Sequence, residues 1–435
     1  MIRTIFCATF AGLVAAAALA ADDPAAAEVI AIRDGKILTV TKGVIEKGTV
    51  LIRGDKLEAV GANLAIPPGA RVIDARGMTV YPGLIDSNTG LGLVEVDLVP
   101  ATVDRVEPSD PITPQMRVVD ALHAESELIP VTRLNGVTAA IVSPAETNTM
   151  SGLSSLILLD GRTVDEMVMV PDIALNINFS PRARRRDKFP ETRMGMISQM
   201  RQAFLDAQDY AQRKARAEAG LEAGGVEERE KEGRGPRPFR HDLKLEALLP
   251  VLEGKRPVIL GATEPSEIKT IMTLAQEFKL RVILSHITHA QDILDEVAAW
   301  NVPVLLGPIY DMPKEEQRYD SVFRLPAELS RRGVKIAFQS ADAHNVRNLP
   351  YQAGYAVAYG LPYDEAIKAI TIYPAEIWGV ADKLGSLEPG KLANVVVATG
   401  DPLEPRTDVK YVFIKGLEIP MESRQSRLYE QYRSR

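Results

Sequence analysis

The hydrophobic and polar positions divide the chain into three zones, of which the two outer ones share the same pattern. Between residues 29 and 80, short apolar runs alternate with turn residues. Asp34-Gly35 and Gly54-Asp55 each separate two such runs, and each therefore predicts a hairpin. The same alternation of apolar runs and turns returns between residues 394 and 416. We therefore expect one small β-sandwich domain that is built from both ends of the chain.

The middle zone follows a different pattern, in which buried-strand runs alternate with amphipathic helical stretches. The strand-like runs cover residues 257–260, 281–284, 302–306 and 335–338, and the helical stretches between them include residues 265–278 and 290–300. This repetition predicts βα units arranged around a parallel sheet. At this chain length the expected fold is a (β/α)₈ TIM-type barrel, with its chemistry at the C-terminal ends of the strands.

An insertion interrupts the βα rhythm at about residues 182–240. Its helical part carries an apolar stripe made of Met196, Met200, Phe204, Ala207 and Ala211. Such a stripe predicts ordinary packing of an added helix, although it also suits the wall of a ligand groove. The basic run at residues 182–186 is either a solvated loop or a phosphate-binding segment.

The first twenty residues have the pattern of a secretory signal peptide. Arg3 supplies a positive charge, an apolar Ala-rich stretch follows, and Ala18-Leu19-Ala20 forms a small-residue cleavage site. A membrane anchor is the alternative, but the apolar run is short for a bilayer span. The single cysteine, Cys7, lies inside this segment, so the mature chain has no disulfide and no thiol ligand. We expect a periplasmic protein.

Composition narrows the class of partner. The chain has 435 residues, of which 46% are hydrophobic and 25% charged, and its formal net charge is −7. This is typical of a soluble globular protein. The mildly acidic balance gives no reason to expect nucleic acid, or a membrane after signal cleavage, as a partner.

The expected domain organisation follows from these zones. Residues 1–20 form the signal peptide, residues 21–82 the N-terminal part of the β-sandwich, residues 83–383 the barrel with its insertion, and residues 384–435 the C-terminal part of the sandwich and a tail. Homo-oligomerisation, or assembly with a paralogue, stays open at this stage.

Four motifs are the most specific features of the chain. They are PGLID at residues 82–86, NGVTAAIV at residues 135–142, ITIYPAEIWGV at residues 370–380 and LGSLEPGKLANVVV at residues 384–397. On these motifs the chain resembles the amidohydrolase superfamily, close to imidazolonepropionase-like and related cyclic-amide or dipeptide hydrolases. The resemblance covers nearly the whole mature chain. It implies the barrel, the small β-domain and a hydrolase that acts on carbon–nitrogen bonds.

The resemblance also implies a metal centre at the barrel mouth. In this family the ligands are an H-x-H pair on the first barrel strand, a Lys or carboxylate on the fourth, one His each on the fifth and sixth, and an Asp on the eighth. The bound cation lowers the pKa of a water molecule towards about 7. The eighth-strand aspartate then takes the proton and returns it to the departing nitrogen.

Most of these ligand positions carry other residues in this chain. The first, fourth and fifth strands offer, respectively, Asn88 and Gly90, Asn176 and Asn178, and Gly261 and Thr263. His286 matches the sixth-strand histidine, and Asp342 matches the eighth-strand aspartate. The chain has 5 histidines, and none of the others falls at the end of the first or fifth strand.

Two interpretations of the remaining residues stay open. His286, Asp342 and His344 can form a reduced zinc site, to which Asn88 or His289 adds a fourth contact. Alternatively, His286 is a hydrogen-bonded residue that holds no metal. If the chain is catalytic, His286 and Asp342 are the candidate catalytic residues, and Asn88 and His344 are the candidate substrate-binding residues.

Two classes of function follow. The first is a hydrolase of small amides, cyclic amides or dipeptides with a reduced or rearranged metal site. The second is a non-catalytic relative that binds a ligand or serves as the partner subunit of a complete paralogue. Acid–base catalysis alone contributes about two to four orders of magnitude, which is too little for an unactivated amide.

Overall fold

The computed structural model describes residues 28–219, 239–310 and 317–434. Its larger part is an eight-stranded barrel sheet in which the strands follow one another in chain order from β6 to β13. The strands are β6 (Leu84–Thr89), β7 (Val137–Val142), β8 (Met150–Leu158), β9 (Val168–Asn178), β10 (Val258–Gly261), β11 (Val282–Ser285), β12 (Val304–Leu306) and β13 (Ile336–Phe338). The TIM-type barrel expected from the sequence is confirmed.

The barrel is nearly closed, because the segment after β13 meets β6. The Ala341 amide donates to the Asn88 carbonyl over 2.9 Å, and the Thr89 hydroxyl donates to the Asp342 carbonyl over 2.8 Å. One strand departs from the all-parallel expectation, since β8 runs antiparallel to both β7 and β9. Residues 143–149 join β7 to β8, and a connection this short cannot hold the crossover helix that a parallel strand needs.

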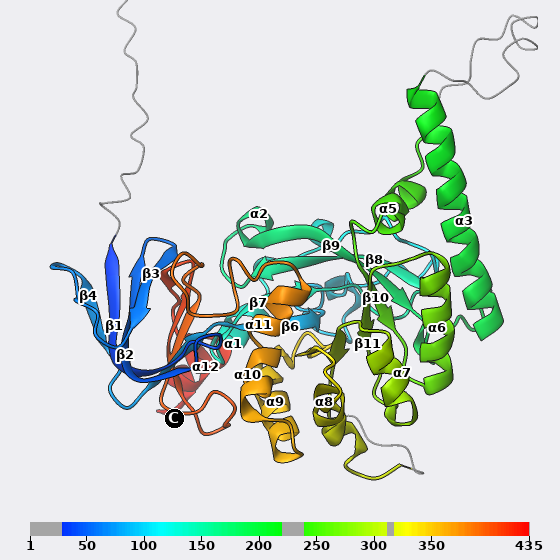
Figure 1. Cartoon of the computed structure of the whole chain (residues 1–435). Coiled ribbons are helices and arrows are strands. Elements are labelled where there is room, and N and C mark those ends of the chain that lie inside the picture. The colour runs from blue at the N-terminus through cyan, green and yellow to red at the C-terminus, as the bar shows by residue number, and fades with distance from the viewer. Residues whose placement is uncertain (1–27, 220–238, 311–316, 435) are drawn as a thin grey trace, which may run out of the picture.

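Most helices lie on the outside of the barrel, and α12 lies beside the small domain (Figure 1). The helices are α1 (Leu128–Arg133), α2 (Val164–Met167), α3 (Arg193–Glu218), α5 (Leu243–Leu252), α6 (Pro265–Glu277), α7 (Leu294–Ala299), α8 (Ser321–Arg331), α9 (Leu349–Ala358), α10 (Tyr363–Ala369), α11 (Ile372–Ile377) and α12 (Arg424–Tyr432). The helix predicted at residues 265–278 matches α6 to within one residue. The helix predicted at residues 290–300 is shorter, because a 3-10 turn at Gln291–Ile293 precedes α7.

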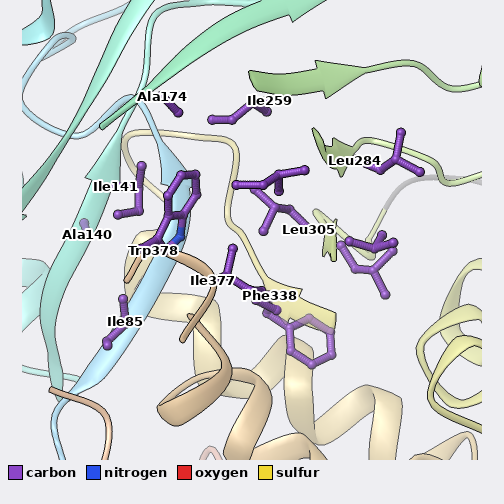
Figure 2. Packing of buried hydrophobic residues seen from close by; sticks show 14 of the residues in the cluster. Ile85, Ala140, Ile141, Ala174, Ile259, Leu284, Leu305, Phe338, Ile377 and Trp378 are labelled. Atoms are coloured by element: carbon purple, nitrogen blue, oxygen red, sulfur yellow. The ribbon is translucent and has the colours of Figure 1, made fainter. Parts of the chain in front are cut away.

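The barrel strands are apolar below the mouth, on both of their faces. Figure 2 shows Ile85, Ala140, Ile259, Leu284, Leu305 and Phe338, which come from six barrel strands, together with Ile377 and Trp378 at the end of α11. All of these side chains are buried, and they belong to one cluster that continues outward to the covering helices. The strands read as near-continuous hydrophobic runs because both of their faces are covered.

The small domain is one sheet built from both ends of the chain, as expected. Its strands are β1 (Val29–Leu38), β2 (Val44–Arg53), β3 (Lys56–Gly61), β4 (Arg71–Asp74), β5 (Thr79–Pro82), β14 (Val395–Ala398), β15 (Val409–Ile414) and β16 (Leu417–Glu418). It lies at the end of the molecule opposite α3 (Figure 1). The sheet rolls on itself, since Lys56 at the start of β3 forms an antiparallel bridge with Leu392 just before β14.

One predicted hairpin in this sheet is wrong. Residues 29–38 form a single strand, β1, that passes straight through Asp34-Gly35, where the register with β2 shifts. Asp34 has a φ of 62°, so the turn-like pair makes a bulge rather than a reversal. The hairpin at Gly54-Asp55 is confirmed, because β2 and β3 pair antiparallel on either side of it.

The insertion is a 26-residue helix, α3, whose stripe packs inward. Met196, Met200, Phe204 and Ala207 are buried, and the Phe204 ring lies 4.9 Å from the Phe278 ring. Ala211 is only half-buried, and Tyr210 is buried in its neighbourhood. Packing, rather than a ligand groove, therefore explains the stripe.

Export is not tested by the fold. The predicted signal peptide lies within residues 1–27, which are outside the described part of the chain. In the part that the structure does describe, no helix is both long enough and apolar enough to cross a bilayer.

Candidate functional site

A cavity of about 570 Å³ opens where the barrel strands end. Its lining comes from the C-terminal ends of successive strands or from the loops that follow them: Asn178 and Ser180 after β9, Gly261 and Thr263 after β10, His286 and Thr288 after β11, Pro308 after β12 and Asp342 after β13. We call this space the mouth cavity. Its volume and position are those of a small-ligand site in a TIM barrel.

His286 is the most firmly held side chain in the mouth cavity. Its Nε2 lies 2.5 Å from Glu146 Oε1, and its Nδ1 lies 2.7 Å from the Ser285 hydroxyl. That hydroxyl donates onward to Gln339 Oε1 over 2.9 Å. The His286 backbone has a φ of 61°, an uncommon conformation for a residue with a side chain. Both ring nitrogens of His286 therefore face oxygen atoms of the protein itself.

Glu146 is a site residue that the sequence reasoning missed. It lies in the short connection between β7 and β8, which returns the chain at the barrel mouth instead of leading into a helix. Burial acts to raise the pKa of the Glu146 carboxyl, but the charge and hydrogen bond of His286 outweigh burial and hold that pKa below its usual range. The only signal in the sequence is a carboxylate placed four residues after a strand end.

Asp342 lines the mouth cavity, but its carboxylate is already engaged by the backbone. Asp342 Oδ1 accepts hydrogen bonds from the amides of His344, at 2.6 Å, and Asn345, at 2.9 Å. Ala341, immediately before it, has a φ of 53°. The aspartate thus fixes the turn that follows β13, and no hydrogen bond among the described residues joins it to His286.

The structure does not bring the other two candidate residues into the mouth cavity. The Asn88 carbonyl accepts the Ala341 amide in the barrel wall, and the residue is buried. His344 Nε2 lies 3.2 Å from the Glu95 carbonyl, and its Nδ1 is 3.9 Å from Asp342 Oδ1. Neither Asn88 nor His344 belongs to the described lining of the mouth cavity, so their substrate-binding role stays a prediction.

Asp86, in the PGLID motif, is a fully buried carboxyl between β6 and the end of β13. Its Oδ1 accepts from the amides of Asn88 and Ser340, each over 3.1 Å. Burial raises the pKa of Asp86 to about 7, and the nearby charge of Asp342 adds to the rise, while these hydrogen bonds oppose it. Asp86 therefore changes charge close to neutral pH.

The residues at the fourth- and fifth-strand ligand positions, Asn178 and Gly261, lie side by side. A Cβ at Gly261 would lie 2.9 Å from Asn178 Oδ1 and 3.8 Å from His286 Nδ1. The Asn178 amide cannot easily withdraw, because its Nδ2 donates to the Asn148 carbonyl over 2.8 Å and to the Ser151 hydroxyl over 2.9 Å. Asn178 thus occupies space that a larger side chain at position 261 requires.

The fold and the cavity define a TIM-barrel protein that carries a ligand site at the strand ends. Comparison with known proteins gives the family. A model described as the amidohydrolase family matches residues 260–419. A solved amidohydrolase from Thermotoga maritima MSB8 superposes with a TM-score of 0.79 at 28% identity, covering 90% of this chain and 99% of that one.

Curated relatives give the same family. The amidohydrolase tasK of Hapsidospora irregularis is 25% identical over 398 residues, which are 86% of this chain and 39% of that protein. An imidazolonepropionase from Alkaliphilus metalliredigens is 47% identical over 53 residues, 11% of this chain and 13% of that enzyme. The chain thus spans well under half the length of these curated relatives. It belongs to the amidohydrolase superfamily.

The residues present do not fit the divalent metal that this superfamily implies. His286 Nε2 is paired with Glu146, its Nδ1 lies next to the Ser285 hydroxyl, and Asp342 Oδ1 accepts two backbone amides. Gly261 offers no donor side chain. Within the described residues, no group of three or more His, Cys, Asp or Glu side chains is placed to hold a metal ion.

Proposed function

We propose that this chain is an exported member of the amidohydrolase superfamily that binds a small amide-type molecule in its mouth cavity without metal-dependent hydrolysis. The barrel supplies the cavity, and neutral hydrogen-bonding groups line much of it, including Asn178, Ser180, Thr263 and Thr288. Ser180 is nine-tenths buried, and its hydroxyl has no hydrogen-bond partner among the described residues. Hydroxyl and amide groups match the donor and acceptor of an amide ligand.

The observation that carries the proposal is the Glu146–His286 contact. A histidine that binds a metal through one nitrogen usually has a carboxylate, a carbonyl or a water on its other nitrogen. Here the protein supplies oxygen atoms to both nitrogens of His286. A cation could bind only by displacing Glu146, whose carboxylate gains its main compensation for burial from His286.

We further propose that the chain works beside a complete relative in the periplasm. The matched segment is only 39% of tasK, so the rest of that protein is long enough for a second unit of this size. A barrel that binds a ligand without hydrolysing it can serve as the binding subunit of a neighbouring catalytic barrel. The signal-peptide pattern of residues 1–20 supports the proposed location.

Metal content decides between binding and metal-dependent hydrolysis. The mature chain is purified without chelator, and elemental analysis is made before and after loading with zinc or manganese. We expect no stoichiometric divalent ion under either condition. A stoichiometric ion that is lost in both His286→Ala and Asp342→Ala would contradict the proposal and establish a rearranged metal site.

Exposed histidines also pick up zinc, so the experiment needs a matched control. His241 is mostly exposed and pairs with Glu246 over 3.3 Å, outside the mouth cavity. An ion that is lost in His241→Ala but retained in His286→Ala is a surface ion and leaves the proposal standing. Calorimetric titration with small amides then tests binding directly, and Glu146→Ala should change the measured affinity.

A further inference from the structure

A second cavity, of about 620 Å³, adjoins the mouth cavity over the loops that follow β10, β11 and β12. We call it the outer cavity. Glu264 and His289 line both spaces, and Glu264 Oε1 lies 3.2 Å from His289 Nδ1. This contact therefore stands where the two cavities meet. Each cavity alone has the volume of a small-ligand site, so one extended molecule can occupy both.

The outer cavity carries an excess of negative charge. Its described lining holds four carboxylates, on Glu264, Asp292, Asp320 and Glu328, against the two guanidinium groups of Arg318 and Arg324. Carboxylates in a cleft with one dominant sign of charge raise the local concentration of ligands of the opposite sign.

The ion pairs within the outer cavity leave part of this negative charge uncompensated. Asp320 takes both cations, because its carboxylate oxygens lie 3.0 Å from Arg318 Nε and 3.4 Å from Arg324 Nη1. Glu328 is only loosely placed, at 3.9 Å from Arg324 Nε. Asp292 has no hydrogen bond or ion pair within the described part of the chain. At least one carboxylate is therefore available to a ligand.

A buried hydroxyl gives an independent reason to place a ligand here. Ser321, the first residue of α8, lines the outer cavity and is nine-tenths buried. Its hydroxyl has no hydrogen-bond partner among the described residues. Leaving a buried polar group unsatisfied is unfavourable, and a ligand that donates a hydrogen bond to it removes this cost. Ser321 in the outer cavity and Ser180 in the mouth cavity therefore share one property, a buried hydroxyl without a hydrogen-bond partner among the described residues.

From these observations we infer that the outer cavity binds the cationic end of the ligand, while the amide group of the same ligand lies in the mouth cavity. This inference rests on the proposed amide-binding function and adds the charge of the ligand to it. An ammonium or guanidinium group meets Asp292, Glu328 and the Ser321 hydroxyl. An anionic group at the same place meets the Asp292 carboxylate, which has no partner within the described residues, and like charges in such a cavity repel.

Calorimetry on the full mature chain tests the inference with three probes of similar length. They are N-acetyl-lysine methylamide, N-acetyl-norleucine methylamide and N-acetyl-glutamate methylamide, which carry the same amides but a cationic, neutral or anionic end. We expect the lysine probe to bind about tenfold more tightly than the norleucine probe, as one well-placed charge contact allows. The glutamate probe should bind most weakly.

Variants test which residues cause the preference for the lysine probe over the norleucine probe. Asp292→Asn combined with Glu328→Gln should reduce the lysine-over-norleucine preference at least about threefold. Asp295→Asn is the matched control, because Asp295 is three residues further along, largely exposed and outside the described lining of the outer cavity. It should retain the full preference.

The outcomes separate this inference from the proposed function. Equal affinities for the lysine and norleucine probes, or a preference that survives in the double variant, would overturn the cationic assignment and leave amide binding intact. If none of the three probes binds, the proposed amide-binding function falls, and the inference falls with it.

Discussion

Two carboxyl groups near the barrel mouth, the fully buried Asp86 and the part-buried Glu146, respond to burial in opposite ways because their partners differ. Asp86 has backbone amides as partners and no cation, so burial dominates and raises its pKa to about 7. Glu146 has an imidazole at 2.5 Å, which outweighs burial and lowers its pKa. At the scale of the residue, the partner therefore decides which carboxyl is charged.

Asp86 makes stability depend on pH. Its pKa is near 3.9 when the chain is unfolded and about 7 in the fold, so the folded chain keeps this proton over the interval between them. The free energy of unfolding therefore falls as pH rises from about 4 to about 7, by at most about 4 kcal/mol, and is level above that. Asp86→Asn should remove this slope.

Urea denaturation of wild type and variant between pH 5 and 8 measures the effect as a difference. Asp165→Asn is the control, because Asp165 lies exposed on α2. If the difference between Asp86→Asn and wild type is independent of pH, the raised pKa is wrong.

The Glu146–His286 contact should be energetically strong. We expect Glu146→Gln and His286→Gln, measured singly and together by urea denaturation, to give a coupling energy of about 1.5–3 kcal/mol, since hydrogen bonds to charged groups fall in this range. His123 and Asp104 form a matched exposed pair at 2.8 Å, whose coupling should be under about 1 kcal/mol. Similar couplings for the two pairs would show that the mouth pair is no more than a surface contact.

At the scale of elements, neighbouring strands constrain each other's side chains. Gly261 on β10 pairs in register with Asn178 on β9, and the Asn178 amide fills the space beside the glycine. The hydrogen bonds from Asn178 to the β7–β8 connection and to β8 explain why it cannot move aside. The side chain that fits at position 261 thus depends on a residue of the neighbouring strand.

This coupling predicts compensation. Gly261→Ala alone should lower the free energy of unfolding by about 1–3 kcal/mol, because its Cβ overlaps the Asn178 amide in a packed wall. When Asn178→Ala is also present, the added cost of Gly261→Ala should nearly vanish. Thermal and urea denaturation of the two single variants and the double variant measure this, and additive costs would show that the two positions are independent.

Element types were readily predicted from the sequence, and connections were not. The strand runs at residues 257–260, 281–284 and 335–338 match β10, β11 and β13 to within a residue or two, because buried parallel strands read as apolar runs. The hairpin predicted at Asp34-Gly35 is wrong, because a pair of turn residues can also form a β-bulge within one strand. The antiparallel direction of β8 was not predicted, because local hydrophobicity does not indicate the direction of a strand. Glu146 was missed for the same reason, since it lies in the short connection that leads into β8.

At the scale of the whole molecule, β14 joins the two domains. Val395 and Val397 belong to the core of the small sheet, whereas Val396 and Ala398 belong to the barrel core. Side chains alternate between the two faces of a strand, and all four are buried. The small domain therefore requires the C-terminal part of the chain. The other face of the same strand packs against the barrel core.

Truncation tests this dependence. A chain that ends at residue 394 loses β14, β15 and β16, and we expect it to be insoluble or to lose cooperative unfolding, because both cores are opened to water. A chain that ends at Ser423 loses α12, in which no residue is buried. It should fold and keep its melting temperature to within roughly 2 °C. A cooperative, soluble chain ending at residue 394 would show that the barrel stands alone.

The sequence by itself determined the fold class and the family, because apolar periodicity and a few motif residues specify strands, helices and the junction of the two domains. It also showed that Asn88, Gly90 and Gly261 stand where the resemblance implies metal ligands. Only the tertiary structure decided what stands there instead: Glu146 against His286, Asn178 beside Gly261, and a second, acidic cavity beyond Glu264 and His289. These contacts join residues far apart in the chain, and only folding sets their distances.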